Sequence, residues 1–173
     1  PSTSPLIVHV DSPAMARALS ADWPPEADTL AARFWPGPLT LVVPKAEAVP
    51  DAVTAGLRTV GLRMPAHPVA LELIRRAGVP VAAPSANRFA GLSPTTAEHV
   101  RRSLGGGGVM VLDAGPTAVG IESTVLSLAG ERALLLRPGM VSRADIEAVI
   151  GPVEGPGAIG TAHPSPGMHR RHY

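Results

Sequence analysis

The sequence of 173 residues contains no cysteine. Disulfide scaffolds, thiolate zinc sites and cysteine nucleophiles are therefore excluded for this chain, and a cytoplasmic location is favoured. Aromatic residues make up only 3% of the chain, so its core must be built mainly from aliphatic side chains. The longest largely apolar runs, such as 39–43 and 133–136, are far shorter than the roughly 20 residues that a membrane-spanning helix needs. We therefore expect no membrane partner.

The charges are nearly balanced. Fifteen Lys and Arg residues against 14 Asp and Glu residues leave a formal net charge of +1, which gives no whole-chain reason to expect a nucleic acid. Hydrophobic residues make up 45% of the chain, enough for a single folded domain. Glycine and proline are abundant, with 18 and 20 residues, and predict many turns.

Strand and helix patterns alternate along most of the chain. Short apolar runs predict strands at 6–10, 39–43, 59–63, 79–83, 109–112, 124–128 and 133–137. Apolar residues at helical spacing, with capping residues before them, predict helices near 13–19, 25–34, 68–77 and 142–150. Thr95 and Glu98 form a capping-box pattern for one more helix, which ends at Leu104. The expected fold is α/β with a mixed sheet.

The last part of the chain has a different composition. From residue 152 to residue 173 no periodicity occurs, and Pro, Gly, His and Arg predominate. Such a segment becomes ordered only against a domain or a partner. We therefore divide the chain into a folded domain over 1–151 and a linker over 152–173.

Small polar residues and arginines follow several predicted strands, where the ligands of α/β proteins usually bind. Ser85 and Asn87 follow a proline after one strand, and their hydroxyl and amide groups suit phosphate or sugar oxygens. Arg63 and Arg137 close two other strands, where a guanidinium suits a carboxylate or a phosphate. Taken singly, Ser85 and Asn87 are more typical of a turn that satisfies its own backbone, and each arginine is more typical of a surface salt bridge.

Other catalytic chemistries have less support. His9 lies inside an apolar run, which is more typical of a structural histidine, and the histidines show no metal-ligand spacing. The glycines at 105–108 lack the Lys-Ser or Lys-Thr of a phosphate-binding P-loop. Ser123 has no histidine or acid at a triad spacing, which disfavours a hydrolase. The residues alone predict an α/β ligand-binding domain with anion-binding arginines.

Six motifs occur in an order that resembles the threonylcarbamoyl-AMP synthase family, whose members contain a YrdC-like domain. In chain order they are P-L-I-V-H-V at 5–10, F-W-P-G-P-L-T-L-V at 34–42, V-G-L-R-M-P at 60–65, A-P-S-A-N at 83–87, G-I-E-S-T-V at 120–125 and L-R-P-G at 136–139. The segment S-P-G-M-H-R-R-H-Y at 165–173 resembles the linker of two-domain members. The resemblance extends over essentially the whole chain.

This resemblance implies a YrdC-like catalytic domain over 1–151, with a twisted mixed sheet flanked by helices and a concave ligand cavity. It implies a nucleotidyltransferase that converts L-threonine, bicarbonate and ATP, with magnesium, into threonylcarbamoyl-AMP and pyrophosphate. The implied partner is the downstream tRNA threonylcarbamoyl transferase machinery. It also implies that complete members carry a further N-terminal segment, with a lysine and an arginine for the ATP phosphates, and a C-terminal domain.

Matched residue by residue, the resemblance also implies a binding site. Threonine contacts are implied for His9, Arg63, Ser123 and the backbone of Ala83, with Arg63 pairing with the threonine carboxylate. The implied nucleotide contacts are Ser4, Thr59, Ser85, Asn87, Ser93, Arg137 and Tyr173. Tyr173 would bring the linker back over the nucleotide as a lid.

Two other functions stay open. A YrdC-like carbamoyl-transfer domain would bind a carbamoyl-adenylate made elsewhere, although the S-P-G-M linker argues against it. A module that binds tRNA or double-stranded RNA would use a positively charged concave face, for which a net charge of +1 gives little support. A purely structural domain would leave the ordered set of polar motifs without a role.

Overall fold

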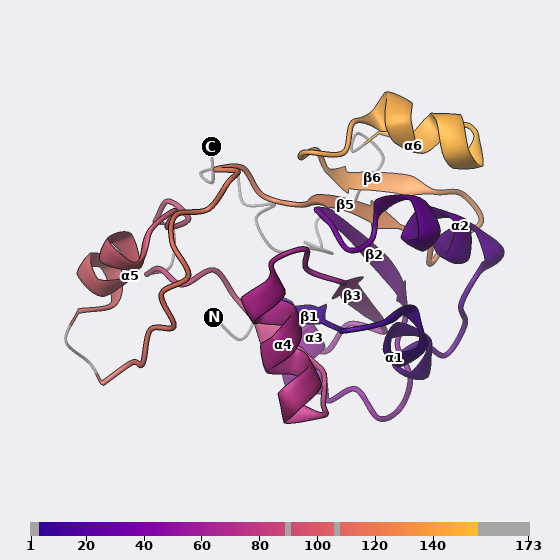
Figure 1. Ribbon diagram of the computed structural model, residues 1–173. Helices are drawn as coiled ribbons and strands as arrows, with labels where there is room; N and C mark the ends of the chain where they lie inside the picture. The colour runs from indigo at the N-terminus through magenta and orange to yellow at the C-terminus, as the bar shows by residue number, and fades with distance from the viewer. Residues whose placement is uncertain (1–3, 89–90, 106–107, 156–173) are drawn as a thin grey trace.

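A computed structural model of the chain describes residues 4–88, 91–105 and 108–155 (Figure 1). Most of the predicted linker, with Tyr173, lies outside the described residues. Within the described ranges, no helix is long and apolar enough to cross a membrane.

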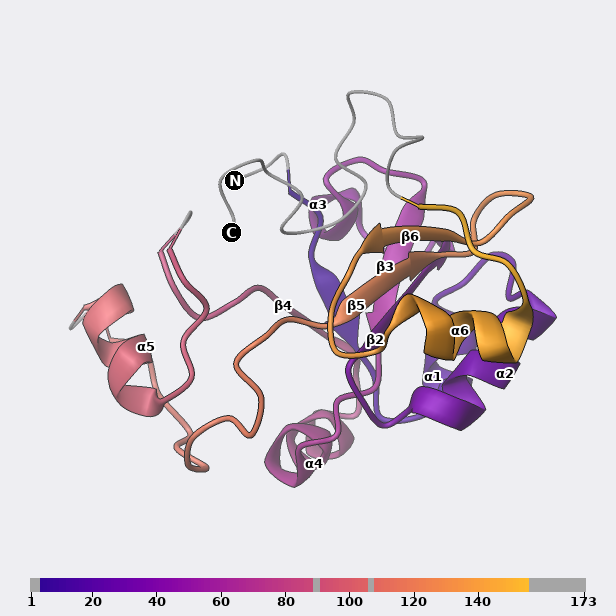
Figure 2. The same cartoon turned by 90° about the horizontal axis from the view of Figure 1, so that it is seen from above.

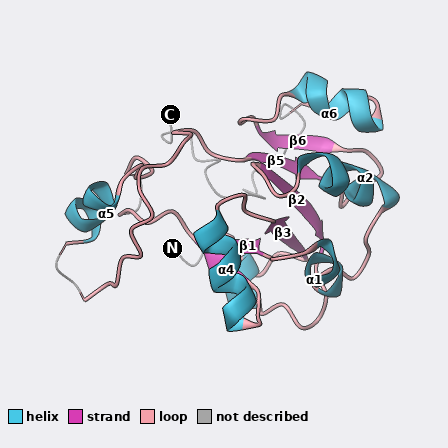
Figure 3. Ribbon diagram, in the orientation of Figure 1, coloured by secondary structure: helices cyan, strands magenta, loops and turns pink. Residues whose placement is uncertain are grey.

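Within residues 4–88, 91–105 and 108–155, six strands form one mixed sheet, so the α/β prediction is confirmed (Figure 3). Across the sheet the order is β4 (Val81–Ala83), β1 (Ile7–His9), β3 (Thr59–Arg63), β2 (Leu39–Pro44), β5 (Thr124–Ser127) and β6 (Leu134–Arg137). The pairs β1 with β3 and β2 with β5 are parallel, and the other neighbours are antiparallel. The predicted hairpin of β5 and β6 is present, with an irregular register between Val125 and Leu126.

Six helices in the described part of the chain connect or flank the strands. They are α1 (Pro13–Ala18), α2 (Pro25–Phe34), α3 (Asp51–Thr54), α4 (Pro68–Ala77), α5 (Ala97–Leu104) and α6 (Arg143–Ile150). Helices α1, α2 and α4 each have a proline in the first turn, where its missing N–H has no intrahelical partner to lose. Ser142 and Asp145 form a capping box at the start of α6.

The two faces of the sheet differ because side chains alternate along each strand. Leu41 and Leu62 point to one face, where they form a fully buried core with Leu30 of α2 and Ile146 of α6. Figure 2 shows α1, α2 and α6 together on this side of the sheet. We call the opposite face, which carries the alternate residues of β1, β2 and β3, the open face.

The predicted strand at 109–112 is wrong. This segment belongs to no strand, and its side chains of Val109, Met110 and Leu112 are 57%, 85% and 61% exposed. It follows α5 in a part of the chain that extends away from the sheet (Figure 1). A strand forms only when its backbone pairs with a neighbouring strand, and in the described residues the sheet ends at β4 without 109–112 beside it.

Several element boundaries also differ from prediction by one or two residues, including those of β4 and α5. Strand β4 begins at Val81, because residues 79–80 do not pair with β1. The cap of α5 is Thr96, whose side chain accepts a hydrogen bond from the backbone N–H of His99, so the predicted capping box of Thr95 and Glu98 does not form. Glu98 instead pairs with Arg102 one turn later on the exposed side of α5.

Candidate active site

Neighbouring strands bring the predicted threonine-binding residues together on the open face. Strand β1 lies between β4 and β3, and His9 is directly opposite Arg63 in the parallel pair. On its other side, β1 places Ile7 opposite Ala83. His9 and Arg63 both follow the open-face residues Ile7 and Gly61 by two positions, so their side chains emerge on the same face.

The guanidinium of Arg63 is oriented by the backbone. Its Nε donates to the carbonyl oxygen of Gly37 at 3.0 Å. Among the described residues, no acceptor is found for the two Nη groups, which are the pair that can bind a carboxylate side by side. Burial lowers the pKa of Arg63, and the charge of Arg137 lowers it further while Glu122 opposes both. The three charged groups therefore belong to one electrostatic cluster.

Arg137 is 3% exposed and holds Ser123 in place. Its Nε and Nη2 donate to the carbonyl oxygen of Ser123 at 3.1 and 2.9 Å, and Nη2 also donates to the Ser123 hydroxyl at 3.1 Å. Its Nη1 forms an ion pair with the carboxylate of Glu122. The Ser123 hydroxyl lies 2.9 Å from the hydroxyl of Thr40 on β2, so both sides of this serine are fixed.

The loop after β4 carries the polar residues predicted to bind the nucleotide. The amide nitrogen of Asn87 donates to the carbonyl oxygen of Gly91 at 2.7 Å, which closes the loop on itself. Ser85 is exposed, and its carbonyl oxygen accepts from the backbone N–H of Asn87 at 2.9 Å. Further along, the hydroxyl of Ser93 donates to Glu122 at 2.9 Å. The loop is thereby connected to the cluster around Arg137.

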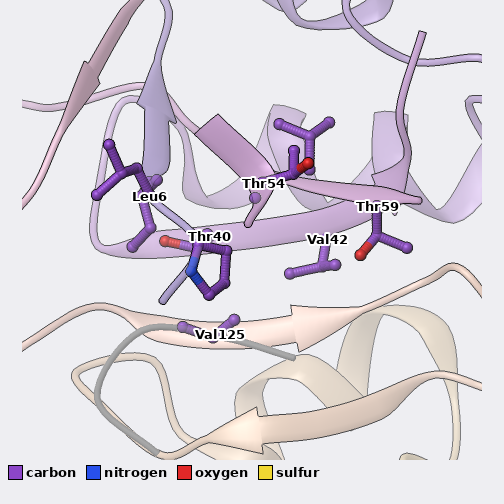
Figure 4. Close-up of a pocket in the computed structure, with 10 residues that line it drawn as sticks. Leu6, Thr40, Val42, Thr54, Thr59 and Val125 are labelled. Carbon is purple, nitrogen blue, oxygen red and sulfur yellow. The ribbon is translucent and has the colours of Figure 1, made fainter. Parts of the chain in front are cut away.

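A small hollow lies on the open face (Figure 4). Its lining residues are Pro5, Leu6, Ile7, Thr40, Val42, Thr54, Thr59, Val60, Gly61 and Val125. Gly61 has no side chain, so the floor of the hollow stays open between its neighbours. The predicted nucleotide residue Thr59 lines this hollow, and Ser4 precedes the lining residue Pro5.

His9 is held in the neutral form. Burial and the nearby charge of Arg63 lower its pKa from 6.5 to about 4. Its Nδ1 is buried, and no described residue forms a hydrogen bond with it. A neutral imidazole with an unused ring nitrogen is suited to hydrogen-bond a polar ligand at neutral pH.

This shift makes the stability of the fold depend on pH. Below pH 6.5 the unfolded chain protonates His9, whereas the folded chain does so only near pH 4. The unfolded state therefore binds more protons, and the free energy of unfolding falls by about 3 kcal/mol as the pH decreases through this interval. Urea unfolding of the wild type and His9→Gln at several pH values tests this. The variant should lack the difference, and parallel curves for the two proteins would contradict it.

Three residues that shape this site have no role predicted from the sequence. Glu122 pairs with Arg137, Thr40 contacts the Ser123 hydroxyl, and the carbonyl of Gly37 orients Arg63. All three lie inside the motifs that carry the family resemblance. Membership of these motifs was the available signal, but the partners of the three residues are 15 to 83 residues away in the sequence, so only folding identifies the contacts.

The residues 4–88, 91–105 and 108–155 contain no group of three His, Asp or Glu side chains arranged to hold a metal ion. These residues therefore do not fit a dedicated magnesium site.

Comparison with known proteins assigns the family. The sequence profile named Sua5_yciO_yrdC, described as telomere recombination, matches residues 1–139, which include every predicted site residue except Tyr173. The chain belongs to the Sua5/YciO/YrdC family. The threonylcarbamoyl-AMP synthase of Bacillus subtilis is 49% identical over 177 residues, covering 100% of this chain and 51% of that protein. The enzyme of the same name from Pyrococcus abyssi is 46% identical, with 100% and 52% covered.

A solved structure supports the same family assignment. The crystal structure of P. abyssi Sua5 complexed with L-threonine matches with a TM-score of 0.94 and 46% identity, over 100% of this chain and 52% of that chain. The predicted YrdC-like fold is thereby confirmed. The chain spans about half the length of the curated relatives that it matches.

Proposed function

We propose that the protein is an L-threonylcarbamoyladenylate synthase that forms threonylcarbamoyl-AMP and pyrophosphate from L-threonine, bicarbonate and ATP. The observation that carries the proposal is the pairing of His9 with Arg63 on the open face, next to the cluster of Arg137, Glu122 and Ser123. The similarity to a Sua5 structure complexed with L-threonine supports the amino acid as the ligand.

In this proposal the Nη groups of Arg63 bind the threonine carboxylate, because they are the parallel donors that a carboxylate accepts best. The neutral imidazole of His9 and the hydroxyl of Ser123 bind the remaining polar groups of threonine. The backbone of Ala83, two strands from Arg63, borders the same pocket.

ATP occupies the region around the hollow and the loop after β4. The proposed contacts are Ser4, Thr59, Ser85, Asn87, Ser93 and Arg137, together with Tyr173 of the linker over 152–173 as a lid over the domain of 1–151. Magnesium enters with the ATP phosphates, since a magnesium ion commonly retains several waters and binds substrate phosphates.

The reaction requires positioning rather than a protein nucleophile. The threonine amine attacks the carbon of bicarbonate, and loss of water leaves a carbamate. A carbamate oxygen then attacks the α-phosphorus of ATP, and the bond from phosphorus to the bridging oxygen breaks, so that pyrophosphate leaves. Fixed donors such as Arg137 suit the charge that develops. The product is an activated carbamoyl donor for tRNA modification in the cytoplasm.

The test is pyrophosphate release by the full-length protein that contains this sequence. With ATP and magnesium present, we expect release only when threonine and bicarbonate are both added. Release without threonine would contradict the proposal. ATP binding without any release would favour the carbamoyl-transfer alternative, and salt-dependent binding of duplex RNA without nucleotide binding would favour the RNA-binding alternative.

A further inference from the structure

Glu122 connects two segments that the sequence keeps apart. One carboxylate oxygen accepts from the hydroxyl of Ser93 in the loop after β4, at 2.9 Å. The other oxygen pairs with Nη1 of Arg137 at the end of β6. The Glu122 side chain is 30% exposed and that of Arg137 is 4% exposed, so the ion pair lies largely out of water.

We propose that Glu122 is a positioning residue for the nucleotide, acting through Ser93 and Arg137. It fixes the Ser93 loop against the sheet and holds the Arg137 guanidinium in the orientation that keeps Ser123 in place. The proposal rests on the proposed function for the identity of the ligand, ATP. No catalytic step is assigned to the carboxylate itself.

A positioning role for Glu122 and a purely electrostatic role predict opposite effects when its charge is removed. A carboxylate that only added negative charge near the ATP phosphates would weaken ATP binding, and its neutralisation would strengthen binding. A positioning carboxylate has the opposite effect, because glutamine at this place accepts one hydrogen bond but no longer neutralises Arg137. The buried Arg137 guanidinium would then lack its ion-pair partner and shift toward another acceptor or water, and the Ser93 loop would lose its fixed position.

Glu122→Gln should weaken threonine binding less than ATP binding. The hydrogen bond that orients Arg63 goes to the carbonyl of Gly37 and involves neither Glu122 nor Arg137. The Ser123 hydroxyl keeps its contact with Thr40 when Arg137 moves. A general loss of structure, in contrast, would weaken both ligands together.

The experiment measures ATP affinity by calorimetry, and the Michaelis constants for ATP and threonine in pyrophosphate release. We expect Glu122→Gln in the full-length protein to weaken ATP binding about tenfold and to change the constant for threonine less than threefold. Glu98→Gln, which removes an exposed carboxylate on α5, is the matched control and should change neither. Tighter ATP binding, unchanged binding, or an equal loss for both ligands would overturn the proposal.

Ser93→Ala removes the same hydrogen bond from the loop side, together with a proposed ATP contact, and covers the case in which Glu122→Gln does not fold. The double variant should weaken ATP binding by less than the product of the two single effects, since both changes break one contact. Without any ligand, hydrogen exchange at 91–97 should accelerate in each single variant. A double variant whose loss of ATP affinity equals the product of the two single losses, with unchanged hydrogen exchange at 91–97, would contradict the proposal. Wild-type protein that binds ATP but releases no pyrophosphate would contradict the proposed function alone, because affinity and exchange still test Glu122.

Discussion

Arg63→Ala should raise the threonine concentration that gives half-maximal pyrophosphate release by about 100-fold or more. Truncating one partner of a buried, hydrogen-bonded charge pair costs about 2–5 kcal/mol, much of it from the partner charge that remains unpaired. Nε of Arg63, and not its Nη groups, donates to the Gly37 carbonyl, so alanine would leave the threonine carboxylate without the paired Nη donors. The dependence on ATP should change much less.

Two further substitutions make the test specific to Arg63. Arg63→Lys keeps the charge but loses the parallel pair of donors, and it should recover only part of the affinity. Arg58→Ala removes an exposed arginine just before the same strand and should have no effect. An unchanged threonine dependence in Arg63→Ala would show that the carboxylate binds elsewhere.

Gly139→Ala should destabilise the fold by about 3 kcal/mol or more and strongly reduce activity, because the new methyl group meets backbone rather than flexible side chains. A Cβ at this position would lie 2.4 Å from the nitrogen of Thr124, 2.6 Å from the carbonyl oxygen of Glu122 and 2.7 Å from the carbonyl carbon of Ser123. The Thr124 nitrogen already donates to the carbonyl of Pro38, so this segment has little room to retreat.

Thermal or urea unfolding, together with pyrophosphate release, measures both effects. Gly130→Ala in the turn between β5 and β6 is the matched control, since the nearest atom to its Cβ is the Arg132 carbonyl oxygen at 4.0 Å. It should change neither stability nor activity appreciably. Normal stability and activity in Gly139→Ala would contradict the close approach of the two segments.

Two kinds of sequence pattern gave different results. Charged residues at strand ends indicated the candidate site, whereas an apolar run predicted one strand that does not form. Arg63 and Arg137 each close a predicted strand, which makes them candidate anion-binding residues. The structure places them close enough for the charge of Arg137 to lower the pKa of Arg63. The strand predicted at 109–112 failed, although its apolar pattern resembles that of β5. Composition marks both segments as apolar, but only β5 lies beside a strand edge, that of β2, with which it pairs.

Patterns among residues close in the sequence predict the helices but not the contacts within the candidate site. Capping and periodicity depend on residues three or four positions apart, so the sequence predicts α2, α4 and α6. The contacts of Glu122 depend on Ser93 and Arg137, which are 29 and 15 residues away. No local rule connects such positions, because the chain between them can take many paths.

The sequence by itself determined the α/β class, most helices, the family motifs and the residue types suited to anions. The tertiary structure decided which of those residues meet. The register of β1 with β3 places His9 opposite Arg63, and the return of β6 along β5 places Arg137 beside Ser123 and Glu122. The physical reason is that hydrogen-bond registers and burial are properties of paired strands, and a buried ion pair is formed only when the whole sheet has closed around it.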